Sequence, residues 1–575
     1  MNRLWIWVVL LIHNYKIHVF CFMIHSSQSL CKPSLNYRQG GLIRHKLQLG
    51  TTEHQQPQQN APADGELRQY FATCIPGLHK VLANELLSLG AANVETSGTA
   101  GVRFTSNSIQ QEDIGLKALL WLRTAHRLME LIATTQSDPY YQSYEGMIRT
   151  KEDLYKFIQR SVPVKSLLGD GQGGLLTLSV SVTINGQVPK ELCHTHYTAL
   201  TVKNALVDQV REMREDGIRP DVDIDDPDVP ILCVLRSRGV YRTSGSTRSD
   251  WDVVEPSDGY LDVSLYRILH SGGSLHRRGY RFSSSESDEK QNYSKSVGII
   301  HKAALKESLA AGLLLESGWH LLVKAAKDDG LPAILVDPMS GSGTLPIEAA
   351  LIAADYAPGL MRIRCYQEDL PLTSNRNKRN PHQVPPCVRW KGSNMSYWKS
   401  LLSDAKDRAI KGMKWMQEMN KVYAYMPNCL LMGNEINVSA ADLAYTNIES
   451  AGFANMIKIR NGDCVSWTLS SESSHRTIID GRTIITTNPP WGLRLSENIE
   501  QSWKSLREFL QRECEGSEAW VLSGNKEVTT FLRMKKSRSL VVQTADEDLR
   551  WIQYHIRYYE KKQVEEYTQQ QVSLE

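Results

Sequence analysis

The stretch PAILVDPMSGSGTLPIEAALIAAD, residues 332–355, joins an apolar run, a glycine-rich turn and a helix-forming run. A short apolar run bounded by turn residues is typical of a buried strand, and the alanine- and leucine-rich run after it predicts a helix. Gly341 and Gly343 let the backbone approach a ligand closely, and the first helical turn presents free N–H groups to a carboxylate or phosphate. The stretch therefore predicts a strand, turn and helix that bind an anionic group.

The alternation of strand and helix continues on the C-terminal side of this stretch. Apolar runs predict strands at 429–433, 456–463, 483–487 and 518–524, and helical runs lie at 294–318, 439–452 and 499–512. Alternating strands and helices predict an α/β domain with a doubly wound, mostly parallel sheet. An insert at residues 356–428 interrupts the series.

The N-terminal half of the chain has a different order of elements. One strand, one helix and two short strands are expected at 70–104, a single amphipathic helix at 115–132, a strand at 175–185 and a helix at 197–213. This mixed order predicts an α+β region rather than a βαβ series. The expected division is a leader and linker (1–64), the α+β region (65–285), the α/β domain (286–560) and a tail (561–575).

Acidic residues at the ends of the predicted strands indicate a nucleoside ligand, because open α/β sheets bind ligands at that edge. Asp337 precedes the glycines, Glu435 is placed to accept hydrogen bonds from ribose hydroxyls, and Asp463 is placed to accept one from an adenine amino group. The turn reads GSGTLP rather than GxGxxG and contains no phosphate-binding lysine, which argues against a dehydrogenase and a nucleoside triphosphatase. S-adenosylmethionine fits instead. The candidate cofactor-binding residues are Asp337, Pro338, Gly341, Ser342, Gly343, Thr344, Glu435, Asp463 and Asn488.

The segment IITTNPPWGLRL, residues 484–495, indicates the chemistry. Two consecutive prolines end the strand in a stiff extended turn. The Asn488 side-chain oxygen and the Pro489 carbonyl are then placed to accept both hydrogens of an exocyclic base amine, and Trp491 to stack on the base, a contact of about 1–3 kcal/mol. The candidate catalytic residues are Asn488, Pro489, Pro490 and Trp491. A purely structural turn, with the Trp covering the core, is the alternative.

Four segments together resemble one family: DPMSGSGTLPIEAALIAADYAPGL (337–360), NPPWGLRL (488–495), LHRRGYR (275–281) and ALKESLAAGLLLESGW (304–319). From Tyr70 to His555 the chain is similar to the THUMP-containing RNA guanine-N2 methyltransferases, in particular the bacterial large-subunit ribosomal RNA enzyme and its plant organellar relatives. The resemblance implies a ferredoxin-like plus THUMP region that binds RNA. It also implies a Rossmann-like class I methyltransferase domain whose last strand, expected at 548–556, is antiparallel.

The chain departs from the family pattern at three positions. Ser340 stands where the family usually has Cys, and Trp491 replaces the commoner Tyr or Phe while keeping a stacking face. Leu493 replaces a usual acidic residue, which puts a carried-over role at that position in doubt. Some bacterial relatives have a second, fused methyltransferase domain. This chain ends without one, so a single activity is expected of it.

Local basic segments are the candidate RNA contacts, because a net charge of +3 provides no global attraction for RNA. The candidates are Lys203, Arg277, Arg278, Arg281, Arg376, Lys378 and Arg379. The first of these resembles a THUMP position, the next three lie at the junction of the two regions, and the rest lie in the acid-free run 373–391 with Arg389 and Lys391. A solvated linker and an ordinary surface loop are the alternatives. No metal is expected, since 193–196 and 221–232 lack complete ligand sets.

These features predict an S-adenosylmethionine-dependent enzyme that forms N2-methylguanosine in large-subunit ribosomal RNA of an organelle. Its expected partner is RNA or a ribosomal particle, and no membrane span is expected. Transfer RNA is the alternative substrate, and a non-catalytic RNA-binding assembly factor is the alternative of another class. Residues 1–52 contain no Asp or Glu, which is typical of an organelle transit segment. A chloroplast location is expected, with the mitochondrion as an alternative and the cytoplasm if the leader reflects a misassigned start.

Overall fold

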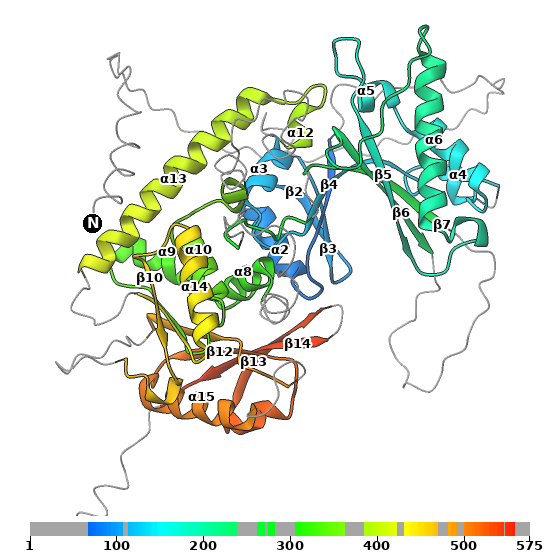
Figure 1. Cartoon of the computed structure of the whole chain (residues 1–575). Coiled ribbons are helices and arrows are strands. Elements are labelled where there is room, and N and C mark those ends of the chain that lie inside the picture. Colours follow the sequence, from blue (N-terminus) through cyan, green and yellow to red (C-terminus); the bar gives the residue numbers. More distant parts are fainter. Residues whose placement is uncertain are drawn as a thin grey trace, which may run out of the picture. The chain divides into compact units, whose positions relative to one another are not determined.

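The computed structural model is organised around two seven-stranded sheets (Figure 1). The structure describes residues 67–106, 113–143, 145–237, 261–270, 274–281, 305–362, 385–422, 430–469, 481–492, 499–544 and 547–557. All of these belong to one compact unit that begins at Ala61. The predicted leader and tail, and the RNA candidates Arg376, Lys378 and Arg379, lie outside the described residues.

The first sheet has the strand order β2-β3-β1-β4-β7-β6-β5. Its strands are β1 (Gln69–Thr73), β2 (Ala92–Ser97), β3 (Gly101–Thr105), β4 (Arg127–Thr134), β5 (Leu178–Asn185), β6 (Val229–Ser237) and β7 (Leu261–Ile268). Strand β4 pairs with both β1 and β7 in antiparallel fashion, so one continuous sheet contains two α+β halves. Helices α2 (His79–Ser88) and α3 (Ile114–Trp121) belong to the first half, and α4 (Lys151–Ser161), α5 (Val164–Leu168) and α6 (Thr195–Met213) to the second.

The single helix expected at 115–132 is wrong. Helix α3 ends at Trp121, and residues 127–134 form strand β4 instead. The chain turns between them because the backbone N–H groups of Arg123 and Thr124 donate to the half-buried carboxylate of Glu85, at 2.8 and 3.1 Å. Pairing of β4 with strands on both sides then outweighs the helical propensity of its leucines.

The second sheet has the order β10-β9-β8-β11-β12-β14-β13. Its strands are β8 (Ile334–Asp337), β9 (Leu431–Glu435), β10 (Ile457–Asn461), β11 (Thr483–Thr487), β12 (Glu518–Ser523), β13 (Lys536–Gln543) and β14 (Asp548–His555). The first five strands are parallel, and β14 runs antiparallel between β12 and β13. The predicted doubly wound sheet and antiparallel strand are confirmed. Strand β13 was not expected from the sequence, because its side chains are mostly exposed and show no apolar alternation.

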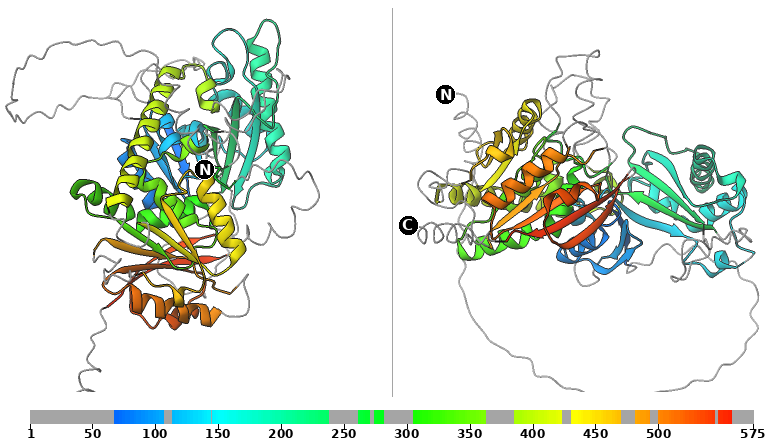
Figure 2. Two further views of the ribbon diagram at one scale, coloured as in Figure 1. Left: turned by 60° about the vertical axis from the view of Figure 1, so that its left-hand side comes forward. Right: turned by 90° about the horizontal axis from the view of Figure 1, so that it is seen from below.

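Helices cover both faces of this sheet (Figures 1 and 2). Helices α8 (Glu307–Glu316), α9 (Trp319–Asp329), α10 (Thr344–Ala353) and α14 (Val438–Ser450) share a hydrophobic core with Leu335. Helix α15 (Ile499–Glu513) shares a second core with Ile334 and Val336. Successive residues of β8 thus serve opposite layers, as the alternation of side chains along a strand requires.

The insert forms helices α12 (Pro386–Arg389) and α13 (Met395–Val422). Gly412 permits close packing of α13, because a Cβ there would lie 1.9 Å from the carbonyl oxygen of Ala354 at the end of α10. Arg389 forms ion pairs of 3.0 Å with Asp226 and Asp228. The insert is therefore attached to the loop before β6. Across the described residues, the structure contains no helix with the length and apolar character of a membrane span.

Candidate active site

The glycine-rich turn lies between β8 and α10 and is bound to the end of β9. Gly341 and Gly343 adopt φ angles of 53° and 79°, which strongly favour glycine. The N–H of Ser340 donates to the carbonyl of Asn434 at 2.8 Å, and the N–H of Gly341 donates to the Glu435 carboxylate at 2.8 Å. A Cβ added to Gly341 would meet no atom within 4 Å, so a ligand can approach the backbone here.

Asn434 organises this edge of the sheet and was missed from the sequence. Its buried side-chain amide donates to the carbonyls of Pro338 at 3.2 Å and Gly462 at 2.9 Å, and its side-chain oxygen accepts from Arg460 at 2.8 Å. One side chain thereby joins the carboxyl ends of β8, β9 and β10. The available signal was a polar residue directly before Glu435 in an otherwise apolar strand.

Asp337 is a buried carboxyl at the end of β8. Burial raises its pKa to about 8, and the nearby Glu435 charge adds to this shift, whereas the Thr487 hydroxyl and the Met339 N–H oppose it. The Met339 N–H donates to the carboxyl at 3.2 Å and so helps to shape the turn. At neutral pH the carboxyl is therefore largely protonated.

The raised pKa of Asp337 predicts a specific pH dependence of stability. Between the unfolded value near 3.8 and the folded value of about 8, only the unfolded state loses the proton, so the stability contribution falls as pH rises. Relative to the wild type, Asp337→Asn should gain about 1.4 kcal/mol of unfolding free energy per pH unit between pH 5 and pH 7. Urea unfolding of both proteins at several pH values measures the difference. Parallel pH profiles would contradict the prediction.

The other two predicted acidic residues lie at neighbouring strand ends. The Glu435 carboxylate accepts from the backbone N–H groups of Gly341 and Asn437, and burial raises its pKa. Asp463 is exposed, and one of its oxygens accepts from the Val465 N–H at 3.0 Å. Because Glu435 pairs with Asn461 in the parallel β9–β10 ladder, the carboxyl ends of β8, β9 and β10 form one edge around the glycine-rich turn.

The NPPW turn follows β11, the strand next to β8. Two indole N–H groups hold it. Trp491 donates to the side-chain oxygen of Asn488 at 3.1 Å, and the fully buried Trp503 of α15 donates to the Pro490 carbonyl at 2.7 Å. The Trp491 ring lies against Gly524, where a Cβ would come within 2.8 Å of it. Trp503 was missed from the sequence because an apolar-face Trp on an amphipathic helix resembles any core residue.

The contact between Trp491 and Asn488 leads to a second prediction. The indole N–H takes one of the two lone pairs of the oxygen that a target amine would need, so it competes with the substrate for this acceptor. Trp491→Phe keeps a stacking ring and removes the competing donor, and it should lower KM for RNA severalfold with kcat nearly unchanged. Trp491→Ala, which also removes the ring, should raise KM about tenfold or more. Steady-state methylation kinetics test this, and a fall in kcat for Trp491→Phe would contradict it.

The predicted RNA contacts at the junction divide into two groups. Arg277 is exposed and Lys203 on α6 is half-buried, so both stay predictions. Arg278 is fully buried, and its guanidinium pairs with the equally buried Glu348 of α10, so the prediction that it contacts RNA is wrong. Arg281 is mostly buried and donates to the Leu305 carbonyl and the Thr344 hydroxyl. Arg389 is paired with two aspartates rather than free for phosphates.

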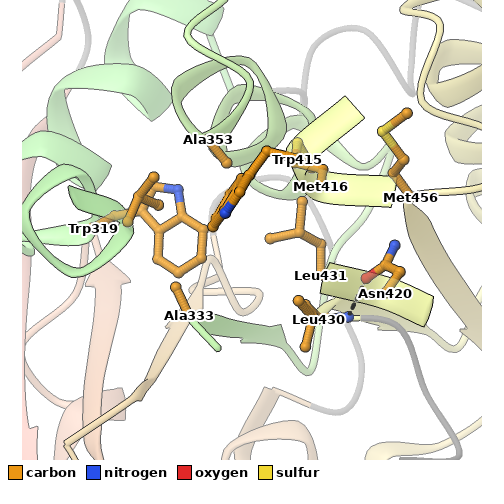
Figure 3. Close-up of a pocket in the computed structure, with 10 residues that line it drawn as sticks. Trp319, Ala333, Ala353, Trp415, Met416, Asn420, Leu430, Leu431 and Met456 are labelled. Atoms are coloured by element: carbon orange, nitrogen blue, oxygen red, sulfur yellow. Dashed lines mark hydrogen bonds between the residues drawn. The ribbon is translucent and has the colours of Figure 1, made fainter. Parts of the chain in front are cut away.

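An apolar pocket lies at the opposite edge of the second sheet (Figure 3). Ala333 and Leu430 precede β8 and β9, whereas the predicted site residues Asp337 and Glu435 are the last residues of these strands. Trp319 and Trp415 line the pocket from α9 and α13, and Asn420 accepts the Leu430 N–H at 3.4 Å. The pocket is therefore separate from the candidate active site.

Three domain families match consecutive parts of the chain. The RlmL ferredoxin-like domain matches residues 69–129, the THUMP domain residues 149–241, and the RMKL-like methyltransferase domain residues 298–553. Ribosomal RNA large subunit methyltransferase K/L of Hydrogenovibrio crunogenus is 27% identical over 82% of this chain and 50% of its own length. The protein with the same name from Aeromonas salmonicida is 28% identical, over 82% and 52% respectively. The chain thus spans about half the length of the curated relatives it matches.

Solved structures show the same fold at low sequence identity. The crystal structure of a possible methylase from Clostridium difficile 630 matches 86% of this chain and 100% of its own with a TM-score of 0.57 and 20% identity. SMU.472, which was crystallised with SAH, matches 86% of this chain and 99% of its own with a TM-score of 0.57 and 18% identity. These solved structures confirm the expected fold class, and the match to the RMKL-like methyltransferase domain confirms the S-adenosylmethionine-dependent methyltransferase class expected from the sequence. The chain therefore contains, in this order, regions that match the RlmL ferredoxin-like domain, the THUMP domain and the RMKL-like methyltransferase domain.

Proposed function

We propose that the protein transfers a methyl group from S-adenosylmethionine to the exocyclic N2 amine of a guanine in large-subunit ribosomal RNA. The observation that carries this proposal is the position of the NPPW turn. It follows β11, whose neighbour β8 leads into the glycine-rich turn, so the candidate amine acceptor and the candidate cofactor loop share one edge of the sheet. The curated relatives named as large-subunit methyltransferases support ribosomal RNA as the substrate.

The residues at this edge fit S-adenosylmethionine. The open space beside Gly341 admits the amino-acid end of the cofactor, which the free N–H groups at the start of α10 would bind through its carboxylate. Glu435 has acceptor capacity left for ribose hydroxyls, because the Gly341 N–H donates to one of its oxygens and the Asn437 N–H to the other, and each carboxylate oxygen can accept two hydrogen bonds. Exposed Asp463 is available to an adenine amino group. When bound, the cofactor would supply an electrophilic methyl group.

The role of the NPPW turn is to orient the target base. An exocyclic amine is a poor nucleophile, because its lone pair is delocalised into the ring. If Asn488 and the Pro489 carbonyl accept the two hydrogens of the amine, a pyramidal nitrogen is favoured. The same two contacts would hold this nitrogen in line with the methyl group. Trp503 fixes the turn through the Pro490 carbonyl, and Trp491 offers the stacking surface. No strong general base is needed, since the amine proton becomes acidic once the methyl group has arrived.

We also propose that the enzyme acts in an organelle, for which the chloroplast is the first choice. The absence of acidic residues from positions 1–52, together with six Lys or Arg residues there, supports an organelle address. A fusion of residues 1–64 to a fluorescent protein tests the address. Fluorescence that stays in the cytosol, or that enters mitochondria, would overturn the chloroplast proposal.

The deciding experiment measures transfer of labelled methyl groups from S-adenosylmethionine to separate pools of unmodified organellar ribosomal RNA and transfer RNA. Mass analysis of the nucleosides then identifies the product. N2-methylguanosine in the ribosomal pool is the expected result, and label in the transfer RNA pool would instead identify transfer RNA as the substrate. Tight RNA binding without any label would favour the non-catalytic assembly-factor alternative.

A further inference from the structure

The segment 274–281 connects the first sheet with the methyltransferase domain and is bonded on both sides. The N–H of Leu275 and the hydroxyl of Ser274 donate to the His126 carbonyl, just before β4, at 2.8 and 3.2 Å. At the other end, one nitrogen of the Arg281 guanidinium donates to the Leu305 carbonyl at 2.7 Å and to the Thr344 hydroxyl at 2.5 Å. This segment therefore reaches the first residue of α10.

Thr344 is a direct connection to the glycine-rich turn. It follows Gly343, whose N–H donates to the Ser340 carbonyl at 2.9 Å to close the turn. The segment also binds Glu348, which lies four residues further on along the same face of α10. Both Arg278 and Tyr280 donate hydrogen bonds to its carboxylate. Residues 278–281 therefore contact both the first residue of α10 and the residue one turn further on.

The surroundings of Arg281 do not suit a phosphate contact. Its side chain is only 17% exposed, and its Nε lies 3.7 Å from the Glu307 carboxylate. An incoming phosphate would have to displace Glu307 and the two hydrogen bonds to Leu305 and Thr344. Those hydrogen bonds involve a charged donor, which makes each of them roughly twice as strong as a neutral one.

We infer that Arg281 is a positioning residue for the cofactor turn: through the Thr344 hydroxyl it sets the affinity for the cofactor, not the affinity for RNA. The identity of the cofactor rests on the proposed function. The inference about the turn itself rests on the hydrogen bonds of Arg281 and the position of Thr344.

The test compares Arg281→Met, Thr344→Val and the double variant with the wild type. S-adenosylhomocysteine binding is measured by calorimetry, and RNA binding by filter retention. Loss of the charged hydrogen bond in Arg281→Met should weaken S-adenosylhomocysteine binding about tenfold or more, with RNA affinity changed less than twofold. The double variant should bind S-adenosylhomocysteine no more weakly than the single variant with the lower affinity, because both substitutions remove the same contact.

Arg362→Met is the matched control, because Arg362 donates to the Leu275 carbonyl of the same segment at 3.0 Å without contacting Thr344. Its affinity for S-adenosylhomocysteine should stay within twofold of the wild-type value. Wild-type affinity for S-adenosylhomocysteine in Arg281→Met, or a loss of RNA affinity alone, would overturn the inference. If Arg281→Met does not fold, Thr344→Val by itself has to show the loss of cofactor affinity.

A second readout separates this inference from the proposed function. Amide hydrogen exchange of the peptide that covers residues 338–348 should be faster in ligand-free Arg281→Met than in the wild type and in Arg362→Met. A wild-type protein that binds no S-adenosylhomocysteine would contradict the proposed function, and the exchange data would still decide the role of Arg281. Equal exchange in all three proteins would overturn that role.

Discussion

Asn488→Ala is expected to lower kcat for RNA methylation about 10²–10³-fold, the range found when one preorganised hydrogen-bonding group is removed from a reacting centre. The Asn488 oxygen is the side-chain acceptor of the NPPW turn, and its present partner is the Trp491 N–H at 3.1 Å. Without it, one hydrogen of the target amine would lose its acceptor and the amine its fixed direction. Single-turnover methylation at saturating cofactor and RNA measures the effect on the chemical step.

Two further variants make the Asn488 result specific. Asn488→Asp keeps an acceptor at nearly the same place, so it should retain more activity than Asn488→Ala. Asn394→Ala is the matched control, because Asn394 accepts the Tyr397 N–H at the start of α13 and belongs to the insert. Its kcat should equal that of the wild type. Wild-type kcat in Asn488→Ala would contradict the assigned role and return the turn to a purely structural one.

Arg278→Met is expected to lower the free energy of unfolding by about 3–5 kcal/mol, the usual cost when one partner of a buried ion pair is removed. Both Arg278 and Glu348 have fully buried side chains. Burial raises the pKa of Glu348, and the charge of Arg278 opposes that rise, so the variant leaves a carboxyl without its main counter-charge. Two backbone carbonyls, of Leu275 and Arg123, also lose a donor. Urea unfolding measures the change in stability.

Neighbouring residues provide the controls for Arg278. Arg277→Met, at an exposed position of the same segment, should change the unfolding free energy by less than about 0.5 kcal/mol. The double variant Arg278→Met with Glu348→Leu should recover part of the lost stability, because it removes the unpaired carboxyl as well. A weakened affinity for RNA with unchanged stability in Arg278→Met would restore the original RNA-contact prediction.

Several elements were predictable from local sequence alone. Strand β11 has the bounds expected from its apolar run, and β8, α10, α14 and α15 lie within a few residues of theirs. Strong periodicity, and Gly or Pro residues at the ends of elements, are local signals. Elements predicted from them therefore recur in the folded protein. The proximity of the candidate cofactor residues was also predictable, because parallel strands necessarily bring their carboxyl ends to one edge.

Long-range contacts decided the parts that the sequence left open. Residues 127–134 became a strand because β1 and β7 pair with them, and β13 formed at an exposed edge that has no apolar pattern. Asn434 and Trp503 organise the site through hydrogen bonds to segments far away in sequence. No local pattern reports such partners, since a polar residue in a strand or a Trp on a helix looks the same with or without them.

The arginines of residues 275–281 separate the two kinds of information most clearly. The sequence by itself determined the α/β methyltransferase domain, its glycine-rich turn and the NPPW turn, because strand, turn and helix signals act over a few residues. It also determined that a basic segment precedes this domain. Only the tertiary structure decided that Arg278 pairs with Glu348 and Arg281 bonds to Thr344, while Arg277 stays exposed. The physical reason is that the role of a charge depends on its burial and its partner, and both are fixed only when distant segments pack together.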